Sequence, residues 1–107
     1  MATRKIVEPS PRERGERAFI DLEASGLNAR SWPIEVGWAF ETGDATSMLI
    51  APHDRWPEDA WETTAAALHG LEIENLRQEG LEARDVCAAL NDALGGVEVY
   101  SDAPEWD

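Results

Sequence analysis

The sequence is poor in cysteine, in basic residues and in long apolar runs. Of its 107 residues, one is cysteine, nine are lysine or arginine and 22 are aspartate or glutamate. The single cysteine, Cys87, excludes an intramolecular disulfide, and we expect it to be a small buried apolar side chain in a reducing compartment. Apolar runs such as Val86–Leu90 are far shorter than the about 20 residues of a membrane-spanning helix. Together with the absence of a secretory leader, these features predict one small cytoplasmic domain without a membrane partner.

The few basic residues are gathered at the start of the chain. Residues 1–17 hold five basic and three acidic residues, so residues 18–107 must carry −15 to give the total charge of −13. Phosphate binding normally depends on Lys and Arg, so an acidic body disfavours nucleic acid. Bound divalent ions would reverse that charge locally. The simpler alternative is an acidic surface that only keeps the protein solvated.

Local patterns divide the chain into a flexible basic arm, residues 1–17, and a folded domain, residues 18–107. In the domain, alternating residues predict three strands that form an antiparallel meander: Ala18–Ala24, Ile34–Glu41 and Thr46–Ala51. A helical period follows, with helices predicted from Pro57 to Gly70, over Leu71–Gln78 and over Leu81–Leu94. A fourth strand, Val97–Ser101, is reached by this helical crossover and should run parallel to another strand. The order β-β-β-α-α-β predicts an α/β sheet with helices packed on it.

Two carboxylates stand two residues apart in the first predicted strand. Asp21 and Glu23 leave the same face as Phe19, with backbone origins roughly 6.6 Å apart. Carboxylates that converge to about 4 Å repel by about 4 kcal/mol at an effective dielectric near 20. A hard cation such as Mg²⁺ would offset this repulsion. Asp107 could reach the same end of the sheet if the fourth strand lies beside the first. The alternative for the pair is two solvated acids on an exposed strand.

Five tryptophans invite a base-stacking interpretation. We expect Trp38 and Trp61 to be core residues, because one lies on the apolar face of a strand and the other in a helix. Trp106, beside Asp107, is the tryptophan for which stacking on a nucleotide is the hypothesis. His53 is expected on the surface, and Glu35 is expected to be hydrogen-bonded on the polar side of the sheet.

Four segments, in order and with compatible spacing, resemble the DEDD-type 3′–5′ exonuclease superfamily, which includes proofreading exonucleases, ribonuclease T and oligoribonuclease. They are Phe19–Leu27, similar to the first motif, Pro33–Ala39, similar to the second strand, Leu68–Leu71, similar to a His-Gly-apolar segment, and Tyr100–Asp107, similar to the second motif. The resemblance implies a ribonuclease H-like mixed sheet, truncated after the fourth strand. It also implies two-metal hydrolysis of phosphodiesters, with Mg²⁺ or Mn²⁺, at the 3′ end of a single-stranded nucleic acid.

The resemblance also implies roles for individual residues. The implied catalytic and metal-binding residues are Asp21, Glu23 and Asp107, and the implied substrate-binding residues are Ser25, Leu27, His69 and Trp106. Asp21 and Asp107 would hold metal ions, and Glu23 would help to position the ions and the nucleophile. Ser25 and Leu27 would lie against the terminal nucleotide, with Leu27 touching a base.

The sequence departs from the superfamily in its second and third motifs. Ser101 and Asp102 stand where many members have His-Asn, and the third motif, with its general-base His or Tyr and its fourth acid, is absent. We therefore assign no general base, describe the domain as C-terminally incomplete, and expect very weak or no turnover from this chain. The alternatives are a non-catalytic acidic interaction module that dimerises through an exposed sheet edge, and an acidic mimic of nucleic acid that occupies a basic partner.

Overall fold

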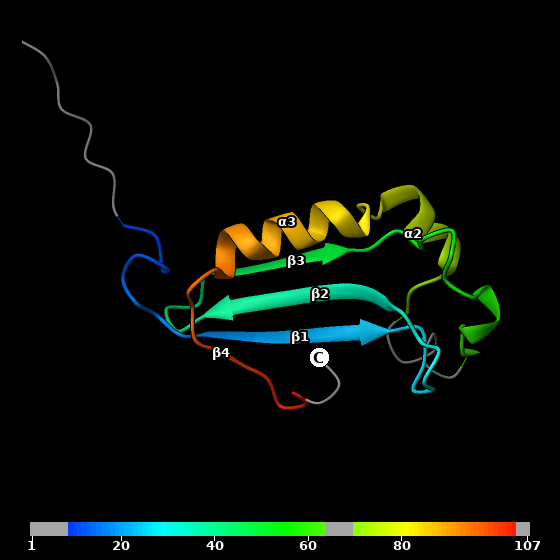
Figure 1. Cartoon of the computed structure of the whole chain (residues 1–107), viewed down its shortest axis with the longest axis horizontal. Coiled ribbons are helices and arrows are strands. Elements are labelled where there is room, and N and C mark those ends of the chain that lie inside the picture. The colour runs from blue at the N-terminus through cyan, green and yellow to red at the C-terminus, as the bar shows by residue number, and fades with distance from the viewer. Residues whose placement is uncertain (1–8, 64–69, 105–107) are drawn as a thin grey trace, which may run out of the picture.

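A computed structural model describes residues 9–63 and 70–104 and contains one four-stranded sheet (Figure 1). In chain order the strands are β1 (Ala18–Ala24), β2 (Pro33–Phe40), β3 (Ala45–Leu49) and β4 (Val99–Tyr100), and in space they follow the order β3-β2-β1-β4. The first three strands are antiparallel neighbours, whereas β4 is parallel to β1. The predicted meander, the helical crossover and the parallel pairing of the fourth strand are confirmed, and its partner is β1.

The helices differ from the prediction mainly at the first one. Instead of an α-helix from Pro57, the chain forms a short 3-10 helix, η1 (Glu58–Ala60), and returns to extended backbone at Trp61, with φ −69° and ψ 120°. Packing explains the difference, because the half-buried Trp61 ring lies 5.7 Å from the ring of Trp32. The part of that predicted helix over residues 64–69 lies outside the described residues. The next two predicted helices are confirmed as α2 (Ile73–Glu79) and α3 (Ala83–Leu94).

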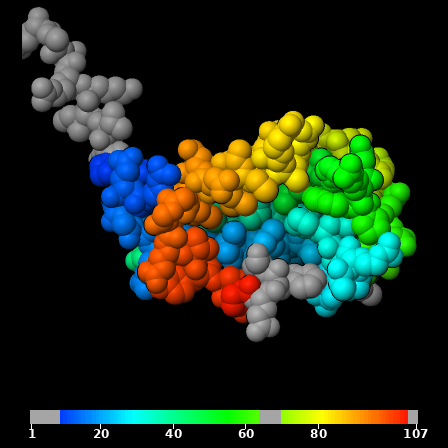
Figure 2. Space-filling view, viewed as in Figure 1, coloured from blue at the N-terminus to red at the C-terminus, as the bar shows by residue number. Residues whose placement is uncertain are grey.

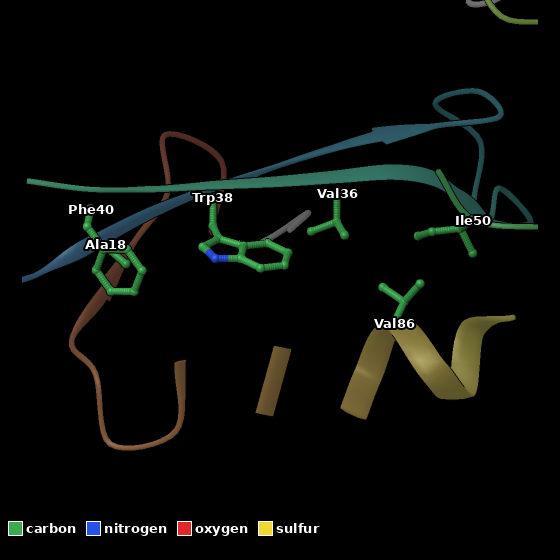
Figure 3. Packing of buried hydrophobic residues seen from close by; sticks show 6 residues of the cluster. All are labelled: Ala18, Val36, Trp38, Phe40, Ile50 and Val86. Atoms are coloured by element: carbon green, nitrogen blue, oxygen red, sulfur yellow. The ribbon is translucent and has the colours of Figure 1, made fainter. Parts of the chain in front are cut away.

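The main core lies between the sheet and α3. Alternation along the strands sends one set of side chains toward the helix, including Val36, Trp38 and Phe40 of β2, all of which are buried. The predicted core position of Trp38 is thus confirmed. Figure 3 shows Val86 of α3 pointing toward Val36, Trp38 and Ile50 on the sheet side. Leu90, Ala93 and Leu94 continue the helical stripe against the same cluster. This packing leaves the opposite face of the sheet without a helix among the described residues.

A second, smaller core lies beside the loop that connects β1 and β2, residues 25–32, which we call the β1–β2 loop. It contains the buried residues Trp32, Ile34, Ala60 and Leu76. The Trp32 ring stacks on Trp56 at 5.7 Å, and its Nε1 donates a hydrogen bond of 2.9 Å to the carbonyl oxygen of Pro57. Trp32 therefore ties the end of the loop to the segment around η1.

Cys87 is exposed, so the expectation of a buried cysteine is wrong. Successive residues of an α-helix turn by about 100°. Because α3 directs Val86 into the core, its neighbour Cys87 points away from the sheet. The predicted stripe of this helix was Val86, Ala89, Leu90, Ala93 and Leu94. The main core includes these residues apart from Ala89, which is partly buried.

Residues 9–17 contact the body of the domain. Arg12 donates a hydrogen bond of 2.6 Å to the carbonyl oxygen of Asp92, and Arg17 forms an ion pair of 2.6 Å with Glu41. Hydrogen bonds from Arg17 lower the pKa of the Glu41 carboxyl. The first eight residues lie outside the described part, and flexibility of the whole arm stays a prediction. Within the described ranges, no helix has the length and apolar character needed to cross a membrane.

Candidate active site

The central strand β1 places Asp21 and Glu23 on the sheet face that α3 does not cover. Both side chains are exposed, and they alternate with the partly buried Ile20 and Leu22, which point toward the core. Asp21 lies opposite Gly37 of β2, a residue without a side chain, so space beside its carboxylate stays open. The predicted common face of the two acids is confirmed.

A third carboxylate faces this pair from the neighbouring strand. Glu35 of β2 is the direct cross-strand partner of Glu23. Like charges placed directly opposite one another destabilise a sheet, and among the described residues no cation pairs with these side chains. Glu35 also makes no side-chain hydrogen bond to a described residue, contrary to our expectation. Hard cations with oxygen ligands are suited to relieve such a local excess of negative charge, and the carboxylate oxygens present are donors of the type that Mg²⁺ and Mn²⁺ prefer.

A groove of about 850 Å³ runs across the same sheet face. Its floor includes Phe19 and Asp21 of β1 with Gly37 and Ala39 of β2, and the chain after β4 adds Asp102. Next to these residues, the ring of Tyr100 lies 5.9 Å from that of Phe19. The two residues are partly exposed, Tyr100 at 39% and Phe19 at 51%. Two acids, Asp21 and Asp102, therefore line an open groove whose walls are mainly apolar.

Ser25 and Leu27 differ sharply in exposure, although both belong to the β1–β2 loop. Ser25 is completely buried, and its hydroxyl accepts a hydrogen bond of 3.0 Å from the backbone N–H of Trp32. This contact shapes the loop from inside. Leu27 is 82% exposed and presents its side chain to solvent. Of the two, Leu27 is therefore the side chain that is available to a ligand.

Three of the predicted site residues lie outside the described part: His69, Trp106 and Asp107. Within residues 9–63 and 70–104, no three His, Cys, Asp or Glu side chains come close enough to hold a metal ion. The described part thus brings Asp21 and Glu23 together on one face, and the third predicted ligand stays a prediction.

The sequence analysis did not identify two residues near the candidate site. Asp102 lines the groove together with Asp21, and Glu62 accepts hydrogen bonds from the β1–β2 loop. Asp102 had a signal, since it belongs to the segment similar to the second motif. Glu62 had none, because it lies 35 positions beyond the backbone N–H that it binds.

Comparisons with known proteins give matches to solved structures alone, since no family model and no curated protein matches the chain. A product-bound exonuclease I superposes with a TM-score of 0.64 and 14% identity, covering 81% of this chain and 21% of that one. Escherichia coli exonuclease I in complex with a dT13 oligonucleotide superposes with a TM-score of 0.65 and 14% identity, covering 81% of this chain and 20% of that one. Exonuclease I from Methylocaldum szegediense superposes with a TM-score of 0.65 and 14% identity, covering 80% of this chain and 19% of that one.

Because the sequence identity is low, these matches show a shared fold alone. They also cover only a part of the longer exonuclease I chains. The chain spans about a fifth of the length of the exonuclease I chains that it matches. The ribonuclease H-like α/β class expected from the sequence is confirmed, with its mixed sheet in the order β3-β2-β1-β4. The chain therefore has the fold of a part of exonuclease I, and this likeness fits the resemblance of its motifs to the DEDD-type 3′–5′ exonuclease superfamily.

Proposed function

We propose that this chain is part of a metal-dependent 3′–5′ exonuclease and that Asp21 and Glu23 contribute to its metal site. The observation that carries the proposal is the pair of exposed carboxylates on the central strand, beside an open groove, in a sheet with the fold of part of exonuclease I. A third carboxylate, Glu35, faces the pair without a described cation to offset it, which supports binding of a divalent ion.

In this proposal each residue has a distinct task. Divalent ions, Mg²⁺ or Mn²⁺, would supply Lewis acidity and a water of lowered pKa for attack on the phosphodiester. Asp21 and Asp107 would hold the ions, and Glu23 would help to place them and the attacking water. Leu27 would touch the terminal base, while buried Ser25 would keep the β1–β2 loop in shape. His69 and Trp106 would contact the substrate at the rim.

The proposed substrate is the 3′ end of a single-stranded nucleic acid. The matched Escherichia coli structures include exonuclease I with a dT13 oligonucleotide, so single-stranded DNA is the substrate to test first. The exposed thiol of Cys87 supports a reducing compartment, such as the cytoplasm, as the proposed location.

Metal-dependent stabilisation tests the proposal on the chain itself. A ligand at 100 times its Kd stabilises the folded state by about 2.7 kcal/mol, so we expect Mn²⁺ to raise the melting temperature. Asp21→Asn should abolish this rise, whereas Glu13→Gln, a charge removed from the exposed segment before β1, should keep it. An equal rise in wild type and Asp21→Asn would overturn the assignment. Metal-dependent trimming of a 3′-labelled oligonucleotide by the complete protein that survives Asp21→Asn would do the same.

A second candidate function is a non-catalytic module that forms a homodimer through β4. Both residues of this edge strand are exposed, Val99 at 41% and Tyr100 at 39%, and unpaired strand edges are sites of strand addition. Sedimentation should then show a dimer that grows with protein concentration and is lost in Val99→Pro, because proline cannot donate the ladder hydrogen bond. A monomer at all concentrations would exclude this candidate.

A further inference from the structure

The β1–β2 loop is closed from inside by a reciprocal pair of hydrogen bonds. The Ser25 backbone N–H donates to the carbonyl oxygen of Trp32 at 2.9 Å, and the Trp32 N–H donates back to the Ser25 hydroxyl at 3.0 Å. Both residues are buried. These bonds fix where the loop begins and ends, but they do not reach its exposed tip.

The tip is contacted from outside by the carboxylate of Glu62. Glu62 Oε1 accepts hydrogen bonds from the backbone N–H of Leu27, at 3.3 Å, and from the Asn28 side chain, at 2.8 Å. The backbone N–H of Glu62 donates to the carbonyl oxygen of Ser25 at 2.8 Å. The bond from the Asn28 amide, followed by that from the Leu27 N–H, lowers the pKa of the Glu62 carboxyl. Figure 2 shows the loop, in cyan, packed on the surface beside the green segment that includes η1.

Gly26 makes this close approach of Glu62 possible. A Cβ atom on Gly26 would stand 2.3 Å from Glu62 Cδ, far inside van der Waals contact. The Glu62 carboxylate is therefore seated in the space that the missing side chain leaves. A second contact on the loop, between Arg30 and Asp59, is an ion pair of 3.1 Å whose side chains are 64% and 72% exposed, and such surface pairs contribute little.

We propose that Glu62 is the positioning residue that fixes Leu27 for contact with the terminal base of the substrate. This inference rests on the proposed function and deepens it. Leu27 is the most exposed large apolar residue among those described, and its backbone N–H is the group that Glu62 binds. Loss of the carboxylate leaves the Ser25–Trp32 closure and the hydrogen bonds from Arg30 and Ser31 to Asn28 in place. It removes the hydrogen bond of the Leu27 N–H, so we expect the fold to persist while Leu27 loses its fixed position.

Hydrogen exchange at the Leu27 amide tests the positioning itself. Glu62→Ala should speed exchange there by about tenfold or more, because the bond to a charged acceptor is gone. Glu62→Gln keeps an amide oxygen as acceptor and should restore most of the protection. Glu79→Ala, an acid removed from the end of α2, is the matched control and should leave the rate unchanged. Equal rates in wild type and Glu62→Ala would overturn the proposal.

Oligonucleotide binding in Mn²⁺ tests the link to the substrate. The wild-type chain should bind a single strand with an intact 3′ base more tightly than one with an abasic 3′ residue. Glu62→Ala and Leu27→Ala should lose this preference, whereas Glu62→Gln should regain it, a pattern that loss of stability alone would not produce. A preference that persists in Glu62→Ala would overturn the assigned role.

The role of Glu62 and the proposed metal site can be tested separately. Asp21→Asn should weaken binding of both oligonucleotides alike, since it removes the metal and not the base contact. If the wild-type chain binds neither oligonucleotide in Mn²⁺, the proposed function falls and the substrate role of the loop falls with it. The exchange rate at Leu27 still decides, in that case, whether Glu62 positions the tip of the loop.

Discussion

At the scale of single residues, the acids on the open face of β1 would bind a ligand, but their mutual repulsion lowers the stability of the sheet. Glu23 lies directly opposite Glu35, and both carry the same charge on the same side of the sheet. Among the described residues no cation offsets them, so this repulsion lowers the stability of the sheet. Acids that serve only solubility would be better spread apart, and their concentration on one strand pair is what points to a ligand.

The cross-strand pair of acids predicts that Glu23→Gln stabilises the metal-free chain. Removing a like-charge contact between strands is worth about 0.2–1 kcal/mol, which corresponds to about 1–8 °C in melting temperature for a domain of this size. Thermal unfolding in EDTA measures the effect, with Glu13→Gln as the charge control. In Mn²⁺ the order should invert, and a lower melting temperature for Glu23→Gln in EDTA would contradict the argument.

The buried hydroxyl of Ser25 makes a different prediction. Ser25→Ala leaves the Trp32 N–H buried without its acceptor, which should cost about 1–3 kcal/mol. Urea unfolding followed by tryptophan fluorescence measures the loss. Ser47→Ala on the exposed part of β3 should change stability by less than about 0.5 kcal/mol. Equal stability of the two variants would show that the Ser25–Trp32 bond does not support the loop.

At the scale of elements, the β1–β2 loop is linked to η1 and α2 through the small second core. Leu76 of α2 is completely buried and packs with Trp32, Ile34 and Ala60. Helix α2 is short, and its own hydrogen bonds would not keep it folded in isolation. Its buried side chain therefore ties the helix to the floor beneath the loop.

This packing predicts that Leu76→Ala destabilises the chain by about 2–5 kcal/mol, as large-to-small changes in a core do. Leu81→Ala, at a position 45% exposed, is the control and should cost much less. Chemical unfolding with fluorescence detection reports both, because three tryptophans stack around the second core. A loss below about 1 kcal/mol for Leu76→Ala would mean that this cluster rearranges to fill the cavity.

The Glu62 contact predicts that acid loosens the tip of the loop. The folded-state pKa of Glu62 lies below the ordinary value of 4.5, so its contribution is complete above 4.5 and is lost as the pH falls through the lowered value. The NMR shift of the Leu27 amide should follow this titration. Glu62→Gln should remove the transition, and a transition that persists in this variant would assign it to another group.

The sequence predicted the elements with a regular period better than it predicted the contacts between them. Alternation placed Val36 and Trp38 in the core and Asp21 on the open face, because a strand offers two sides only. The burial of Trp32 was missed, since a loop has no period from which to infer an inner side. Helix formation at Pro57 was predicted wrongly because tertiary packing of Trp61 outweighs the local helix signals. Glu62 depends on a fold-level contact that no spacing encodes.

At the scale of the whole molecule, the net charge of −13 acts on every part of the fold. Self-repulsion of this size destabilises a compact state. Raising ionic strength from 0.01 to 0.15 M shortens the screening length from about 30 to about 8 Å, so we expect the melting temperature to rise with NaCl. A fall would mean that surface ion pairs such as Arg30–Asp59 outweigh the general repulsion.

Because NaCl alone should raise the melting temperature, the effect of Mn²⁺ must be compared with that of NaCl. Mn²⁺ should stabilise the chain beyond NaCl at matched ionic strength, because Asp21 and Glu23 would bind the ion and not merely attract it. The excess should vanish in Asp21→Asn, while the NaCl effect remains.

The parallel pairing of β4 with β1 joins parts of the chain that are about 80 positions apart, through two register pairs, Ala18 with Val99 and Phe19 with Tyr100. Contacts of such long range close late and slow a folding reaction. During synthesis on the ribosome, the meander and its helices can assemble first, while the β4 side of β1 stays open until residue 100 has emerged. Among the strand pairings of the described sheet, the last to form is thus the one that borders the groove beside Asp21.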